Sequence, residues 1–126
     1  MKDEHGHEGF SMRQRGKSIR FAFTGLIHAI KTQHNLWIQL AAMGAIILLG
    51  IIYPITGTEW ALLAFATGLV ISAELVNSAI EALTDLVSPG TNPRAGMIKD
   101  MAAAAVLIAA LSALAIGLIV FIPYFF

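Results

Sequence analysis

Residues 74–85 (ELVNSAIEALTD) place polar side chains along one side of an otherwise apolar predicted helix. They directly follow an apolar run at 60–73, WALLAFATGLVISA, so the predicted helix crosses a membrane and ends among acids. At about 100° per residue, five side chains fall within about 60° of one direction. This polar stripe consists of Glu74, Asn77, Ser78, Glu81 and Asp85. Ionisable groups at membrane depth are costly, so the stripe indicates a functional site.

The residue types of the stripe suit two chemical tasks. Glu74, the deepest acid, can accept a proton from a hydroxyl group held in the membrane. Glu81 and Asp85, nearer to water, can bind Mg²⁺ together with the amide oxygen of Asn77, because Mg²⁺ prefers hard oxygen ligands. Lys99, at the start of the next apolar segment, adds a positive charge that can stabilise a transferring phosphoryl group. From residue types alone, interfacial phosphotransfer and proton-coupled transport both remain open.

A structural role for the stripe is the alternative. Glu81 or Asp85 could pair with Lys99 or Arg94 in a helix-packing seam, and for Asp85 and Asp100 this role is as acceptable as a functional one. Seams are more simply built from Ser, Thr, Gly and Ala, however. Two glutamates in one span therefore favour function.

Composition places the chain among membrane proteins. Of 126 residues, 57% are hydrophobic and only 13% are charged, and soluble domains carry about a quarter charged residues. The net charge is zero and no basic block is present, which argues against a nucleic-acid partner. The absence of cysteine excludes disulfides, thiol catalysis and thiolate metal sites. The length allows one domain that cannot enclose a pathway or a large pocket alone, so we expect oligomerisation.

The predicted fold is an all-α membrane protein with an amphipathic surface helix and three transmembrane helices. Residues 1–10 are predicted to be a disordered polar tail, and they lack the features of a cleaved signal peptide. The histidines and acids of this tail could bind a metal weakly, but a solvated tail explains them better. A single membrane domain, 11–126, follows. Its elements are a headgroup-level helix at 11–33 and spans at about 35–53, 59–87 and 98–124, with a polar loop at 88–96.

The positions of the basic residues predict the orientation. All eight lysines and arginines lie in the first 31 residues or around the second loop, at Arg94 and Lys99. The positive-inside rule then places the N-terminus in the cytoplasm and the C-terminus outside.

The segments ELVNSAIEALTD and KDMAAAAVLIA resemble the prokaryotic diacylglycerol kinase/undecaprenol kinase family of small integral-membrane lipid kinases. The hallmark of that family is E-x-x-N-S/T-A-I-E-x-x-x-D on the second span, followed by K-D-M/V at the start of the third. The matching positions are Glu74, Asn77, Ser78, Ala79, Ile80, Glu81, Asp85, Lys99, Asp100 and Met101. The resemblance covers residues 17 to 122.

The resemblance implies an ATP-dependent kinase for a membrane lipid alcohol, diacylglycerol or undecaprenol, in the bacterial cytoplasmic membrane. It also implies a homotrimer with active sites between neighbouring protomers at the cytoplasmic interface. Glu74 would be the catalytic base and, with Ser78, would contact the acceptor; Glu81 and Asn77 would serve Mg²⁺ and the nucleotide. The remaining nucleotide-binding positions implied are Asp85, Lys99, Asp100, Gly96, Arg13 and Phe21.

One position departs from the family pattern. Relatives carry a metal-binding glutamate before the first span, where this chain has Gln33 within TQHNLWIQ. Glutamine keeps an oxygen ligand but lacks the charge, which should weaken cation binding unless His34 or Asp100 compensates. A catalytically weak member of the family is therefore an alternative, as is a small oligomeric proton or cation transporter.

Overall fold

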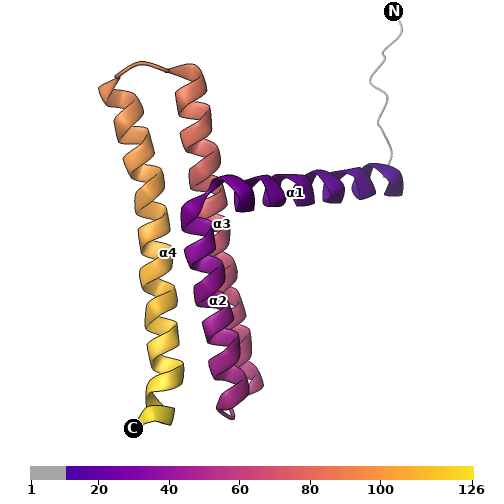
Figure 1. The fold of residues 1–126 in the computed structure, drawn as a ribbon, viewed down its shortest axis with the longest axis vertical. Helices are drawn as coiled ribbons and strands as arrows, with labels where there is room; N and C mark the ends of the chain where they lie inside the picture. The colour runs from indigo at the N-terminus through magenta and orange to yellow at the C-terminus, as the bar shows by residue number, and fades with distance from the viewer. Residues whose placement is uncertain (1–10) are drawn as a thin grey trace, which may run out of the picture.

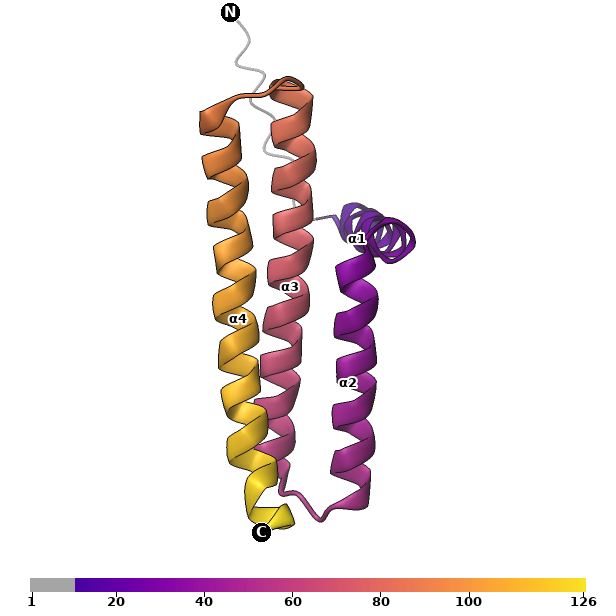
Figure 2. The ribbon, with the colours of Figure 1, turned by 60° about the vertical axis from the view of Figure 1, so that its left-hand side comes forward.

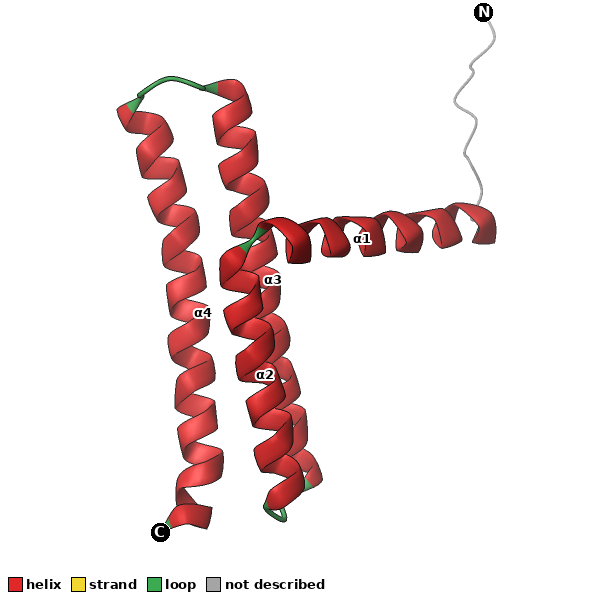
Figure 3. Cartoon of the chain, in the orientation of Figure 1, coloured by secondary structure: helices red, strands yellow, loops and turns green. Residues whose placement is uncertain are grey.

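The computed structural model describes residues 11–126, which form four helices and no strand. The helices are α1 (Met12–Thr32), α2 (His34–Ile52), α3 (Gly57–Val87) and α4 (Pro93–Phe125) (Figures 1 and 3). The last three are each long and apolar enough to cross a membrane, which confirms the predicted all-α fold with three spans. The predicted polar tail lies outside the described residues.

Polar side chains determine where three of the helices begin. Ser11, Thr56 and Asn92 accept hydrogen bonds from backbone N–H groups in the first turns of α1, α3 and α4. The third span was predicted to begin at residue 98, and the helix that contains it, α4, begins at Pro93, because Asn92 caps the helix and proline fits its first position. The loop is therefore 88–92, and Gly96 lies inside α4 rather than in the loop.

The three apolar helices lie side by side, and α1 points away from them (Figures 1 and 2). The corner is Gln33, the single extended residue between α1 and α2. Both α2 and α4 pack along α3, and α1 contacts α2 and α3. The hairpin of α3 and α4 continues past the level of α1, so its loop end projects beyond the corner (Figure 2).

Close packing and hydrogen bonds join the helices at the opposite end, near the α2–α3 turn. Leu63 of α3 packs against Val120 and Phe121 of α4. Gly50 of α2 faces Trp60, and a Cβ atom at this glycine would lie 2.5 Å from the Cη2 atom of that ring. The glycine therefore permits the close approach of α2 to α3.

The C-terminal part of α4 is also fixed to this turn. The Tyr124 hydroxyl lies 3.2 and 3.3 Å from the two carboxylate oxygens of Glu59, and 3.3 Å from the carbonyl oxygen of Pro54. The ring of Tyr53 packs against Tyr124 and Phe125. Glu59 is thus occupied with a structural contact at the end of the bundle remote from the polar stripe.

Candidate active site

The polar stripe continues the buried face of α3 toward the loop end. Leu63, Ala66 and Val70 are buried on that face, at spacings of three and four residues, and Glu74 and Asn77 follow at the same spacing. The exposed fraction of Glu74 is only 3%, and that of Asn77 is 8%. Glu74 and Asn77 therefore lie inside the bundle.

Glu74 has no hydrogen-bond or ion-pair partner among the described residues. The Lys99–Asp85 contact and the packing of Val120 on Leu63 set an antiparallel register that puts Glu74 opposite Ala109. A buried carboxylate beside a small apolar residue is costly unless it is protonated or meets a partner. Such a group is suited to accept a proton from an incoming ligand.

Asn77 and Glu81 lie one helical turn apart and leave a free oxygen ligand. The Asn77 Nδ2 atom donates to the Glu81 Oε1 atom at 3.5 Å, a long hydrogen bond, while the Asn77 Oδ1 atom is buried without a partner. An amide oxygen that lacks a donor, next to a carboxylate, fits a hard cation such as Mg²⁺. Within residues 11–126, no three His, Asp or Glu side chains form a metal cluster. Phosphate oxygens, water or another protomer would have to supply the other ligands.

Asp85 and Lys99 form an ion pair between α3 and α4. Their side chains are 64% and 37% exposed, respectively, and an exposed pair contributes little stability. The ion pair that the sequence suggested as a structural role for Asp85 is thus present. Because it contributes little stability, either residue can leave it for another partner at little cost. Asp100 and Gly96 are exposed nearby on α4, and a Cβ atom at Gly96 would contact nothing within 4 Å.

Gln33 lies at the level of the stripe, because the α1–α2 corner packs beside α3. A cavity of about 340 Å³ is lined by Gln33, Ser78 and two residues near the end of α1, His28 and Thr32. Its wall on α3 is completed by Leu75 and Ala79. Sequence reasoning did not include His28 and Thr32 in the site, since only the corner at Gln33 turns them toward α3.

Arg13 and Phe21 lie on α1, away from the corner at Gln33. Both are exposed on α1, about 30 Å and 18 Å along the helix from Gln33 at 1.5 Å per residue. The sequence groups them with the nucleotide site, and that grouping stays a prediction.

Comparisons with known proteins agree on the family that the chain resembles. The model of the family described as prokaryotic diacylglycerol kinase matches residues 20–121. The chain is 34% identical to the undecaprenol kinase of Bacillus subtilis (strain 168), over 85% of this chain and 87% of that protein. It is 35% identical to a diacylglycerol kinase of Synechocystis, over 84% of this chain and 61% of that protein. A Helicobacter pylori diacylglycerol kinase is 29% identical, over 79% of this chain and 83% of that protein.

Proposed function

This chain belongs to the prokaryotic diacylglycerol kinase family and is a membrane lipid kinase, and from that premise we propose that it transfers the γ-phosphate of ATP to a lipid alcohol, diacylglycerol or a polyprenol such as undecaprenol. The observation that carries the proposal is the burial of Glu74 without a partner, one turn from the free amide oxygen of Asn77. Proton acceptor and cation ligand are thereby adjacent on one helix face.

In the proposed reaction, Glu74 takes the proton of the lipid hydroxyl. The hydroxyl oxygen forms a bond to the γ-phosphorus, the bond from that phosphorus to the bridging oxygen breaks, and ADP leaves with the electron pair. Glu74 then releases its proton to water. General base catalysis of this kind contributes roughly 10²- to 10⁴-fold, and positioning and electrostatics supply most of the remainder.

Asn77 and Glu81 would hold Mg²⁺ through the amide oxygen and the carboxylate. When bound, the ion neutralises charge on the β- and γ-phosphates. Lys99 would leave Asp85 and pair with phosphate, an exchange of one exposed ion pair for another. Asp100 and Gly96 would border the nucleotide from the first turns of α4, and Ser78 would contact the acceptor.

The arrangement in the membrane is also part of the proposal. Ile19, Phe23 and Ile27 of α1 are half or more exposed, which suits a helix in the headgroup layer. That layer would coincide with the level of Gln33 and Ser78, so Glu74 would meet lipid hydroxyls while the loop end of α3 and α4 would meet ATP. The N-terminus would be cytoplasmic and the C-terminus outside, as the basic residues indicate.

We further propose a homotrimer in which α1 of one protomer completes the site of the next. Support comes from the distance along α1 that separates Arg13 and Phe21 from the corner at Gln33. Projecting away from the bundle, as Figure 1 shows, α1 is free to present both residues to a neighbour. The transporter alternative is less well supported, since Glu59 is the one acid near the α2–α3 turn within residues 11–126 and it is engaged by Tyr124.

Phosphorylation of lipid alcohols by the purified protein in mixed micelles with radiolabelled ATP tests the proposal. Wild-type protein should phosphorylate at least one alcohol, and Glu74→Gln should lower kcat by at least about 10²-fold. Nucleotide binding with Mg²⁺ should persist in this variant. Glu59→Gln is the matched control, since the same change is made to an acid at the other end of α3. Full activity in Glu74→Gln, or no product from any alcohol, would refute the mechanism.

A further inference from the structure

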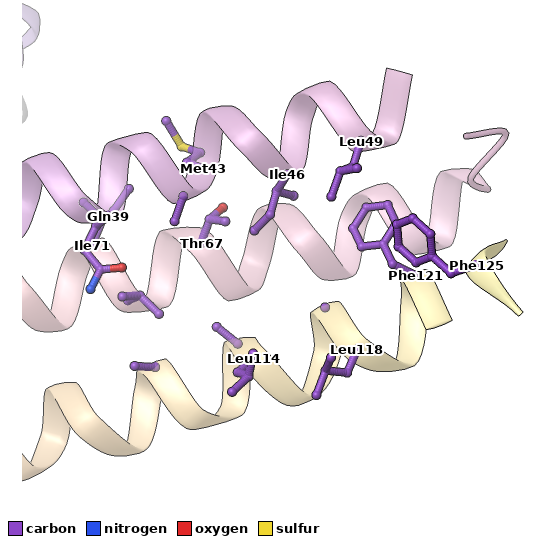
Figure 4. A pocket seen from close by; sticks show the side chains of 15 residues that line it. Gln39, Met43, Ile46, Leu49, Thr67, Ile71, Leu114, Leu118, Phe121 and Phe125 are labelled. Atoms are coloured by element: carbon purple, nitrogen blue, oxygen red, sulfur yellow. The ribbon is translucent and has the colours of Figure 1, made fainter. Parts of the chain in front are cut away.

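A single apolar groove runs along the bundle below the stripe, between α2 and α4, with α3 as its floor (Figure 4). It exists because α2 and α4 each pack on α3 but make no comparable contact with each other. Its volume is about 410 Å³. Side chains from all three helices face it, among them Met43, Ile46, Thr67, Ile71, Leu114 and Leu118.

The groove is suited to hydrocarbon over almost its whole length. Only two of the residues that line it carry polar side chains, Gln39 and Thr67. The Thr67 hydroxyl donates its proton to the carbonyl oxygens of Leu63 and Ala64, so it has no proton left to donate to a ligand. Gln39 lies at the end nearer to the stripe, as Figure 4 shows. The Gln39 end is therefore the part of the groove that best suits a polar group of a ligand.

The Gln39 end of the groove lies directly below the proposed catalytic base. On α3 the floor includes Val70 and Ile71, and Glu74 follows by three to four residues, or about 5–6 Å along the axis. On α4 the groove begins at Ala110, next to the residue that lies opposite Glu74. A hydrocarbon chain in the groove would thus carry a terminal hydroxyl close to this carboxylate.

The groove is longer than one leaflet is thick. From Ala110 to Phe125 it follows α4 for fifteen residues, or about 22 Å. Half of a hydrocarbon core of ~30 Å is about 15 Å, so the groove passes the midplane if its upper end is at headgroup depth. The two acyl chains of a diacylglycerol anchored in the inner leaflet end near the midplane, whereas one long isoprenoid chain can continue beyond it.

We propose that this groove binds the tail of the acceptor, and that the acceptor is a polyprenol, a primary alcohol with one long isoprenoid chain. The inference rests on the proposed kinase activity and deepens it by naming the acceptor class and the residues that select it. One narrow groove, apolar below its mouth and ending under Glu74, matches one chain with one hydroxyl at its end.

The first test is a chain-length series of prenols: geraniol, farnesol, geranylgeraniol and undecaprenol, each in mixed micelles. The value of kcat/KM should rise by roughly tenfold from geraniol to geranylgeraniol, a modest gain because the tail leaves one apolar medium for another and gains only packing contacts. It should then level off once the groove is full. Diacylglycerol at the same mole fraction should compete poorly with undecaprenol.

The second test closes the groove at its middle. Gly117 lines it about seven residues from Ala110, and a Cβ atom there would meet no atom within 4 Å, so Gly117→Leu adds volume to the groove from an open position. The ratio of kcat/KM for geranylgeraniol to that for geraniol should fall to near one. Gly44→Leu is the matched control: it makes the same change in a span, also with open space around it, but outside the groove, and should keep the wild-type ratio.

The outcomes separate the inference from the function on which it rests. Equal kcat/KM for all prenols, or a preference for diacylglycerol that Gly117→Leu leaves intact, overturns the inference while kinase activity stands. A change in oligomer mass in Gly117→Leu, with all acceptors slowed alike, also overturns it, since a helix of a second copy would then fill the groove. Absence of product from every alcohol in the wild type overturns both.

Discussion

Replacing Asn77 by leucine should make the protein more stable and at the same time weaken its response to Mg²⁺. The two effects are expected together because the amide is buried and only partly satisfied. A residue kept for structure would show the opposite sign, since loss of a structural amide destabilises the fold. The sign of the stability change thus distinguishes a structural Asn77 from one that serves a ligand.

The structure sets the magnitude. The Asn77 Oδ1 atom is buried without a donor, and an unsatisfied group of this kind costs about 1–3 kcal/mol. The hydrogen bond that would be lost, from Nδ2 to Glu81 at 3.5 Å, is at the limit of hydrogen-bonding geometry. Extra volume of leucine can enter the neighbouring cavity of about 230 Å³ that Asn77 lines. We therefore expect a net stabilisation of about 1–2 kcal/mol, or a rise in Tm of roughly 2–8 °C.

Thermal unfolding in detergent measures the first effect, and lipid phosphorylation across a Mg²⁺ titration measures the second. Asn77→Leu should raise the Mg²⁺ concentration for half-maximal activity by at least about tenfold, the usual effect of losing one group that supports a metal. Thr84→Val is the matched control. Thr84 is buried to the same extent on the same face, and its hydroxyl is already satisfied by the carbonyl oxygen of Ile80 at 2.7 Å. This control should shift neither Tm nor the Mg²⁺ response appreciably.

A lower Tm in Asn77→Leu would show that the amide is a structural partner and would refute the reasoning. An unchanged Mg²⁺ titration would remove Asn77 from the metal site, whatever the change in Tm.

Three further predictions concern the corner, the ion pair and the packing of α2. Gln33→Glu should lower the Mg²⁺ concentration for half-maximal activity several-fold, because it adds a charged oxygen ligand beside the stripe. A Mg²⁺ titration at fixed ATP measures this effect. An unchanged titration would place Gln33 outside the metal site. The double variant with Asp85→Lys and Lys99→Asp should keep an ion pair and the wild-type Tm, but its KM for ATP should be raised. Steady-state kinetics measures KM. A wild-type KM in this variant would assign the pair a structural role only. Gly50→Ala should destabilise the protein by about 1–3 kcal/mol through overpacking against Trp60, and Trp60→Leu in the same chain should relieve part of that loss in thermal unfolding.

The sequence determined what depends on local periodicity and composition. Apolar runs long enough to cross a membrane are properties of single segments, and so is the alignment of Glu74, Asn77 and Glu81 on one helix face. By hydropathy the polar first turn of α4 is typical of a loop, so the predicted span begins at residue 98 although the helix begins at Pro93. The Asn92 cap and Pro93 decide that boundary instead.

Only the tertiary structure decided how the helix faces meet. The angle of α1 at Gln33 moves Arg13 away from the stripe of its own chain while it brings His28 beside Ser78. The periodicity of one helix cannot predict the distances between residues of different helices, because these distances depend on how the helices cross and how closely they approach. The same reason explains why the groove between α2 and α4 was not foreseen: its walls come from three segments whose separation is set by their packing on α3, not by the residues of any one of them.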